Sequence, residues 1–177
     1  MKNIFWLILL LPLQLTGSSL QDSLANDIED QRLNHFTLIE AAFIISGAKT
    51  SQELDENIQW FESILDDVRD KRLIDNFEQV ASAEKLFLYL HTTWLEEYQE
   101  EATTLIDIRE KRKFNCVSAT ILYNLTCNEF GLHTMAFETP THVYTIFTNF
   151  TENIMVENTT SIGFNIIQNL DNYSRYM

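Results

Sequence analysis

The chain has 177 residues, of which 45% are hydrophobic and 12% aromatic, and it carries 26 acidic side chains against 12 lysines and arginines. This composition excludes disordered and fibrous proteins, and the length predicts one compact domain with a sizeable core. The formal net charge of −14 repels phosphates, so we expect neither nucleic acid nor an anionic lipid surface as a partner.

The first eighteen residues have the order of parts found in a secretory signal. Lys2 precedes an almost unbroken apolar run, Ile4–Leu13, and small and polar residues follow up to Ser19. Ten apolar residues at about 1.5 Å each span only about half of a hydrocarbon core of ~30 Å, which disfavours a transmembrane helix. We therefore expect residues 1–18 to be a cleaved signal peptide. The remaining chain is expected to be exported, to the periplasm or out of the cell, without stable insertion in a membrane.

Helical spacing of apolar residues dominates the lead-in, residues 19–110. Thr50 followed by Glu53 fits a capping box, and apolar residues then recur every three or four positions, which predicts a helix. A second helix is predicted over 81–95, whereas the apolar segment 38–46 fits a helix or a strand equally well. We interpret the acidic run that follows the second helix as a solvated helix face: Glu96, Glu97, Glu100 and Glu101.

The pattern changes after Phe114. The segment 116–130 predicts a helix with Asn115 as its N-cap and Gly131 as its stop. Three segments rich in β-branched and aromatic residues follow and predict strands: 134–138, 142–147 and 153–157. Helices first and an antiparallel sheet last predict an α+β fold. We expect it to form a single domain over 19–177, with a catalytic-type core at 111–177.

A cysteine occupies the predicted first position of the helix that begins after Asn115. Unsatisfied backbone N–H groups and the helix dipole favour an anion at that position, so Cys116 is favoured as a thiolate. The three basic residues at 111–113 act in the same direction. Cys127 lies about 16 Å further along the same helix, too far for a disulfide, and we interpret it as a small buried hydrophobe.

A histidine and a carboxylate stand at the ends of two neighbouring predicted strands. His142 begins the second strand and Glu157 ends the third. A four-residue loop at 148–151 would pair Phe147 with Glu152 and set the histidine directly opposite the carboxylate, with Cβ atoms about 5 Å apart. A slip by one residue would instead place the two on opposite faces. In the first register the carboxylate would orient the imidazole, which could then take a proton from the cysteine thiol.

The order and spacing of these residues resemble the core of transglutaminase-like proteins, a superfamily related in architecture to papain. The resemblance is closest to the bacterial transglutaminase-like cysteine proteinases and covers about residues 107–164. In that superfamily a cysteine begins a central helix, and a histidine and an acid follow on successive strands. The stretches that carry the resemblance are Phe114-Asn-Cys-Val-Ser-Ala-Thr-Ile-Leu-Tyr, Phe130-Gly-Leu, Pro140-Thr-His-Val-Tyr and Val156-Glu-Asn-Thr-Thr.

The resemblance implies a role for each residue of the motif. Cys116 would be the nucleophile, His142 the general base and acid, and Glu157 the orienting acid, where the family more often has aspartate. Two candidates could supply the oxyanion donor, the backbone N–H of Cys116 and the side chain of Asn115. Tyr144, two residues after the histidine on the same strand face, is a candidate for lining the substrate cleft, with ordinary sheet packing as the alternative.

No metal site or cofactor is expected. None of the four histidines pairs at the spacing of a metalloprotease helix, and Cys116, Cys127 and His133 do not have the spacing of zinc ligands. The chain also lacks a glycine-rich phosphate loop. Trp60, Trp94 and Tyr98 occur at helical spacings, and we predict that they pack in the core.

Two functions of different class remain open. The first is an exported thiol hydrolase or acyl transferase that acts on the amide bonds of a protein or peptide substrate through Cys116, His142 and Glu157. Nothing in the sequence identifies a site for an amine acceptor, which favours hydrolysis. The second is a non-catalytic protein-binding module that retains the transglutaminase-like fold. The reactivity of the thiol separates the two functions, because a binding module has no need of an activated cysteine.

Overall fold

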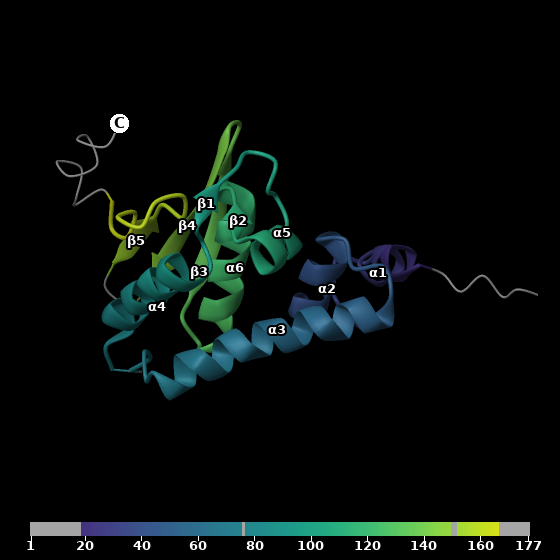
Figure 1. Cartoon of the computed structure of the whole chain (residues 1–177), viewed down its shortest axis with the longest axis horizontal. Helices are drawn as coiled ribbons and strands as arrows, with labels where there is room; N and C mark the ends of the chain where they lie inside the picture. The colour runs from purple at the N-terminus through teal and green to yellow at the C-terminus, as the bar shows by residue number, and fades with distance from the viewer. Residues whose placement is uncertain (1–18, 76, 150–151, 167–177) are drawn as a thin grey trace, which may run out of the picture.

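The structure is a computed structural model, and it describes residues 19–75, 77–149 and 152–166. The predicted signal peptide at 1–18 lies outside the described residues. Within them the chain forms six helices, a two-stranded parallel sheet and a three-stranded antiparallel sheet (Figure 1). The predicted α+β class is confirmed.

Four helices form the first half of the described chain: α1 (Leu20–Asp27), α2 (Leu38–Ile45), α3 (Ser51–Asp70) and α4 (Gln79–Thr93). The segment 38–46, which was ambiguous by pattern, becomes a helix because Thr37 caps it with a complete capping box. Thr50 caps α3 as predicted and accepts a hydrogen bond from the N–H of Glu53. The Glu53 carboxylate, however, accepts from the N–H of Lys49, so only the N-cap half of the predicted box forms.

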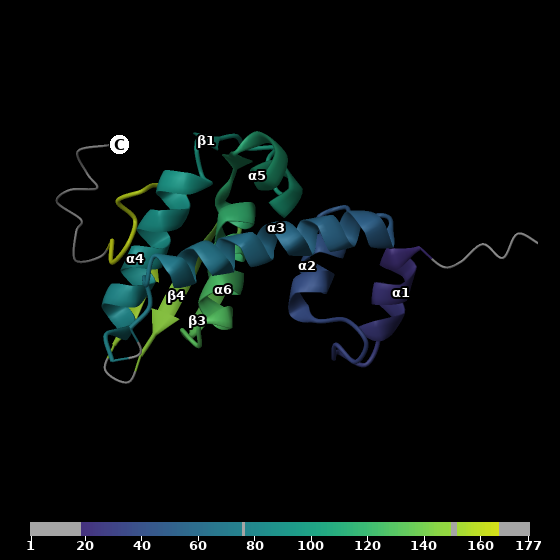
Figure 2. The same ribbon diagram turned by 60° about the horizontal axis from the view of Figure 1, so that its bottom comes forward.

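The long helix α3 connects the two ends of the molecule, with α1 and α2 at one end and α4 following at the other (Figures 1 and 2). Buried hydrophobic side chains from both ends join in one core cluster that extends from Leu24 to Phe164. The cluster includes Phe43, Phe61 and Phe87, each at most 1% exposed. The lead-in helices and the C-terminal part of the chain therefore share a single hydrophobic core.

The acidic run at 96–101 is not the solvated helix face that the sequence predicts. The N–H groups of Glu96 and Glu97 both donate to the carbonyl oxygen of Arg112, at 3.1 and 3.2 Å, which draws the chain out of helical geometry. Strand β1 (Glu97–Tyr98) consequently pairs in parallel with β2 (Lys113–Phe114), and helix α5 (Leu105–Lys111) connects the two strands. Trp60 and Trp94 are half-buried and pack edge to face, with ring centroids 5.1 Å apart, as expected of core residues.

Helix α6 (Cys116–Glu129) begins and ends almost where the sequence predicts. Asn115 is its N-cap, and Gly131 follows its C-cap, Phe130, with φ of +68°. A positive φ is readily adopted by glycine and ends the helix at this point. The chain can then reverse into the antiparallel sheet.

The antiparallel sheet has the order β3 (Thr134–Thr139), β4 (His142–Thr148) and β5 (Asn153–Val156). The predicted register between the last two strands is wrong by two residues, because Phe147 pairs with Ile154 instead of Glu152. Just after β4, the side chain of Asn149 accepts a hydrogen bond from the N–H of Glu152, and the N–H of Asn149 donates to the Glu152 carbonyl. A shift by two residues preserves the face of every side chain, so His142 and Glu157 remain on one face as diagonal neighbours.

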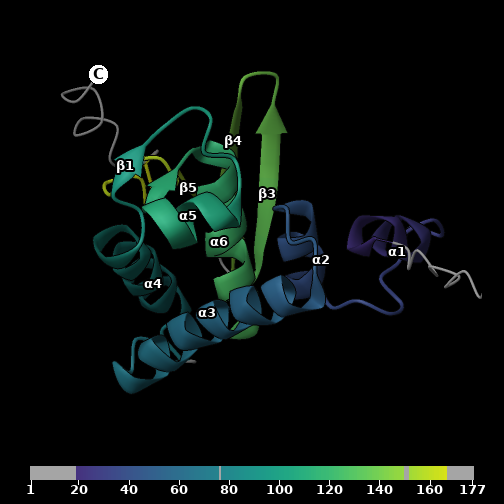
Figure 3. The same ribbon diagram turned by 45° about the vertical axis from the view of Figure 1, so that its right-hand side comes forward.

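Helix α6 lies between the sheet and α4. It contacts β3 and β4 on one side, and Tyr123 meets Phe87 of α4 on the other, with ring centroids 5.9 Å apart. The β3–β4 hairpin rises beyond the end of α6 that adjoins β2 (Figure 3). The beginning of α6, the tip of the hairpin and the β1–β2 pair therefore gather at one end of the molecule.

Candidate active site

Cys116 is the first residue of α6 and is half-buried. The side-chain oxygen of Asn115 accepts from the N–H groups of Val117 and Ser118, at 2.9 and 3.1 Å, and its amide nitrogen donates to the Glu100 carbonyl at 2.8 Å. The Asn115 side chain is thus held in a structural role. Across the described part of the chain no hydrogen bond uses the backbone N–H of Cys116, so this N–H is the freer of the two oxyanion candidates.

The imidazole of His142 is bonded to the carboxylate of Glu157. The distance from Nε2 to Oε2 is 2.5 Å, and the histidine side chain is 34% exposed against 6% for the glutamate. The other carboxylate oxygen, Oε1, accepts from the backbone N–H and the hydroxyl of Thr159, at 3.0 and 2.6 Å. An ionised carboxylate can only accept, so Nε2 carries a hydrogen and the Nδ1 lone pair is the one left to accept a proton.

A buried polar network fixes the middle of β4 against α6. The Thr145 hydroxyl donates to the side-chain oxygen of Asn124 at 2.8 Å. The side-chain amide of Asn158, which is 1% exposed, donates to the hydroxyls of Thr145 and Thr120 at 2.8 and 3.1 Å. Because both helix partners lie on one face of α6, these bonds fix the height and the rotation of the strand relative to the helix.

The same network bears on where the beginnings of α6 and β4, which carry Cys116 and His142, lie relative to each other. The N–H of Thr148 donates to the carbonyl of His133, just past the end of α6, so β4 and α6 run in the same direction. His142 precedes Thr145 by about 10 Å along the strand, and Cys116 precedes Asn124, the helix partner of Thr145, by about 12 Å along the helix. Both candidates therefore lie toward the beginning of their elements, at the same end of α6 and β4, although no hydrogen bond of the described residues involves the Cys116 thiol.

Tyr98 lies near both the cysteine and the carboxylate. Burial raises the pKa of its phenol, and the charges that Cys116, Glu100 and Glu157 carry when ionised act in the same direction, so both site residues lie within electrostatic reach of the phenol. Its partner in the parallel pair is Phe114, with ring centroids 6.0 Å apart. The prediction that Tyr98 packs in the core is wrong, because it is 51% exposed.

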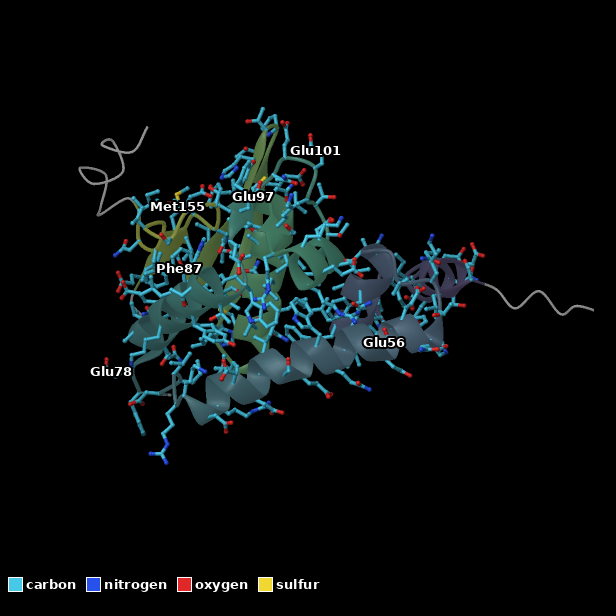
Figure 4. The ribbon with its side chains drawn as sticks, in the orientation of Figure 1. Glu56, Glu78, Phe87, Glu97, Glu101 and Met155 are labelled. Atoms are coloured by element: carbon cyan, nitrogen blue, oxygen red, sulfur yellow. The ribbon has the colours of Figure 1, made fainter. Side chains whose placement is uncertain are left out.

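Tyr144, the candidate for lining the substrate cleft, packs against other rings of the same sheet. Tyr144 lies against the His142 ring, at a centroid distance of 6.4 Å, and against Phe137 at 5.2 Å. These contacts lie on one face of the sheet, and the cleft-lining role of Tyr144 stays a prediction. Glu97 and Glu101 are at the end of the molecule toward which the hairpin rises (Figure 4).

His91, on α4, is a half-buried histidine whose Nε2 atom is buried. Its ring centroid lies 4.5 Å from that of Phe87 and 6.0 Å from that of Phe114, and its Nε2 has no hydrogen-bond partner among the described residues. Burial lowers its pKa from 6.5 to about 4, although the charge of Glu157 acts in the opposite direction. Sequence patterns gave no sign of this residue, because a histidine in an apolar helix has no distinguishing spacing.

The lowered pKa of His91 makes stability depend on pH. Between pH 6.5 and about 4 the unfolded chain binds a proton at this side chain and the folded chain does not, so the free energy of unfolding falls as the pH is lowered. We expect this fall in the free energy of unfolding to be on the order of 3 kcal/mol and to be absent in His91→Leu, as measured by urea unfolding at both ends of this pH range. The matched change at exposed His133 should leave the pH dependence intact, and equal slopes in the two variants would refute this assignment.

No group of three or more His, Cys, Asp or Glu side chains in the described ranges is arranged to hold a metal ion. None of the described helices is long and apolar enough to cross a membrane. No protein-family model, curated protein or solved structure matches the chain. Its function is therefore argued from its own residues.

Proposed function

We propose that the chain is an exported thiol hydrolase or acyl transferase of the transglutaminase-like kind, acting on the amide bonds of a protein or peptide substrate. The observation that carries the proposal is the 2.5 Å bond between the buried carboxylate of Glu157 and His142, the first residue of β4, in a chain where Cys116 is the first residue of α6. Cysteine at a helix start, histidine at a strand start and a buried acid after the next strand form the order that the sequence resemblance implies. Export follows from the proposed removal of residues 1–18.

The chemistry divides among three groups. Glu157 holds the Nε2–H of His142, and Nδ1 takes the proton of the Cys116 thiol. The thiolate attacks the amide carbonyl carbon, and the backbone N–H of the cysteine stabilises the oxyanion. The imidazolium then gives its proton to the departing amine as the C–N bond breaks, which leaves a thioester. Water releases the acid, or a second amine takes the acyl group.

The alternative is a non-catalytic protein-binding module with the same fold. One observation favours it, since the Cys116 thiol makes no hydrogen bond among the residues that the structure describes. Catalysis requires the thiol and Nδ1 of His142 to come within hydrogen-bond distance once substrate is bound. Catalytic hydrogen bonds are often long in the ligand-free state and shorten in the complex. Thiol chemistry separates the two functions.

We expect Cys116 to be alkylated by iodoacetamide rapidly at about pH 6.5, where an ordinary thiol is mostly protonated, and His142→Ala to slow this reaction by about tenfold or more. Peptide mapping by mass spectrometry assigns the label. Cys127 serves as an internal control for folding, because it is fully buried and burial raises the pKa of its thiol.

His133→Ala is the matched control for this measurement, since His133 is exposed and lies beyond the end of α6. It should alkylate at the wild-type rate. If His142→Ala also keeps the wild-type rate, the cysteine and the histidine do not act as a pair, and the binding module becomes the better account.

A further inference from the structure

An apolar cavity of ≈ 470 Å³ lies between α2, α6 and the β3–β4 hairpin. Its volume is within the range of sites that bind small organic molecules. Most of the side chains that line it are aliphatic and come from all four elements; they include Ala42, Ile45, Val117, Ile121, Ala136 and Val143. The α2 rim is open to solvent, where Ile45 is 74% exposed.

The walls of the cavity suit a hydrocarbon. No aspartate, glutamate, lysine or arginine contributes to its lining. Two of its polar side chains, Thr120 and Asn124, are already bonded to Asn158 and Thr145 across the helix–sheet interface. Its other polar side chains, on 128–134, gather where α6 ends. A charged ligand would lose its hydration along most of this surface without gaining a partner, whereas an aliphatic chain has no polar group to desolvate.

The cavity does not include Cys116 or His142 themselves, but it begins at the next residue of each element. Val117 directly follows Cys116, Val143 directly follows His142, and both line the cavity. Helix α6 continues the lining from Val117 to Asn128, which is about 16 Å along its axis. The apolar cavity thus extends along the helix whose first residue carries the thiol, starting one residue after it.

We infer that this cavity holds the aliphatic part of the acyl group that Cys116 takes up, so that the chain prefers substrates with a leucine-like or longer hydrocarbon on the acyl side of the cleaved bond. The inference rests on the proposed function. It concerns which acyl groups are accepted, and it is separable from the reactivity of the thiol.

A series of p-nitrophenyl esters, from acetate through butyrate to hexanoate, tests the inference. The Cys116 sulfur forms a bond to the ester carbonyl carbon, the carbon–oxygen bond breaks, and p-nitrophenolate leaves as the thiol proton passes to His142. Full burial of one methylene corresponds to about a fourfold gain. We therefore expect the rate with hexanoate to exceed that with acetate by at least about tenfold, relative to the same ratio for a free thiol.

Filling the cavity should remove this preference. Ala42→Phe, from the α2 wall, and Ala136→Phe, from the β3 wall, are each expected to lower the hexanoate-to-acetate ratio to within about twofold of the free-thiol value. Ala25→Phe, on an exposed position of α1, is the matched control and should keep the wild-type ratio. Thermal unfolding verifies that each variant is folded. Two variants from opposite walls are used so that the test stands if one of them does not fold.

The possible outcomes distinguish the two ideas. A wild-type chain that reacts with acetate and iodoacetamide but shows no preference for chain length overturns the cavity inference and leaves the proposed function in place. A preference that survives in both filled variants also overturns it. A Cys116 that reacts with neither the esters nor iodoacetamide removes the proposed function, and the inference with it.

Discussion

Replacing Cys116 with alanine is expected to abolish acyl transfer from p-nitrophenyl hexanoate, lowering the rate by at least about a thousandfold, because no other group can form the thioester. The same change should alter the free energy of unfolding by less than about 1 kcal/mol, since the side chain is only half-buried and makes no hydrogen bond within the described ranges. Stopped-flow release of p-nitrophenolate and urea unfolding measure the two quantities on the same preparation.

Cys127→Ala is the matched control, and it should behave in the opposite way. Cys127 is 0% exposed in the core, so truncation leaves a small cavity and lowers the free energy of unfolding by about 1 kcal/mol. Its acyl transfer should remain at the wild-type level. If Cys116→Ala retains activity, or if Cys127→Ala loses it while folded, the assignment of the nucleophile is wrong.

Much of the second half of the chain could be predicted because its signals are local. Asn115 and Gly131 bracket α6 through capping and a left-handed turn, which depend on a few neighbouring residues. The three strands follow from β-branched and aromatic runs, and their residues fall within one or two positions of the predicted ranges. The predicted contact between His142 and Glu157 is present although the predicted register is wrong, because a shift of two residues between the strands leaves every side chain on the same face.

The features that escaped prediction depend on partners distant in sequence. β1 exists because Glu96 and Glu97 meet the carbonyl of Arg112, and a two-residue strand leaves no periodicity to detect. The exposure of Tyr98 follows from that pairing. Similarly, Asn158 reads as an ordinary polar residue after a strand, yet it is buried and joins β4 to α6. Such roles appear only once the elements have been assembled.

Glu157 owes its position to the chain that folds back over it. The strand β5 ends at Val156, and Val156 then forms an isolated bridge with Phe164. The N–H of Glu157 donates to the carbonyl of Gly163 at 2.9 Å, and the N–H of Gly163 donates to the carbonyl of Thr160 at 3.0 Å. This return loop covers the carboxylate, which explains why a residue beyond the end of a strand is almost fully buried.

Gly163→Ala is expected to disrupt this return loop and to lower the free energy of unfolding by about 3 kcal/mol or more. A Cβ atom at this position would lie 1.9 Å from the carbonyl oxygen of Glu157 and 2.9 Å from its Cβ, and a backbone atom cannot move aside as a flexible side chain can. Gly131→Ala is the matched control: it places a residue at φ of +68° but meets nothing within 4 Å, so we expect a loss of only about 1 kcal/mol. Because the displaced carboxylate would no longer orient His142, Gly163→Ala should also slow alkylation of Cys116 at about pH 6.5 as His142→Ala does, whereas Gly131→Ala should not.

Equal stability of the two variants would show that the return loop does not approach Glu157 as described. A destabilised Gly163→Ala with normal alkylation would show that the carboxylate stabilises the fold without positioning the imidazole.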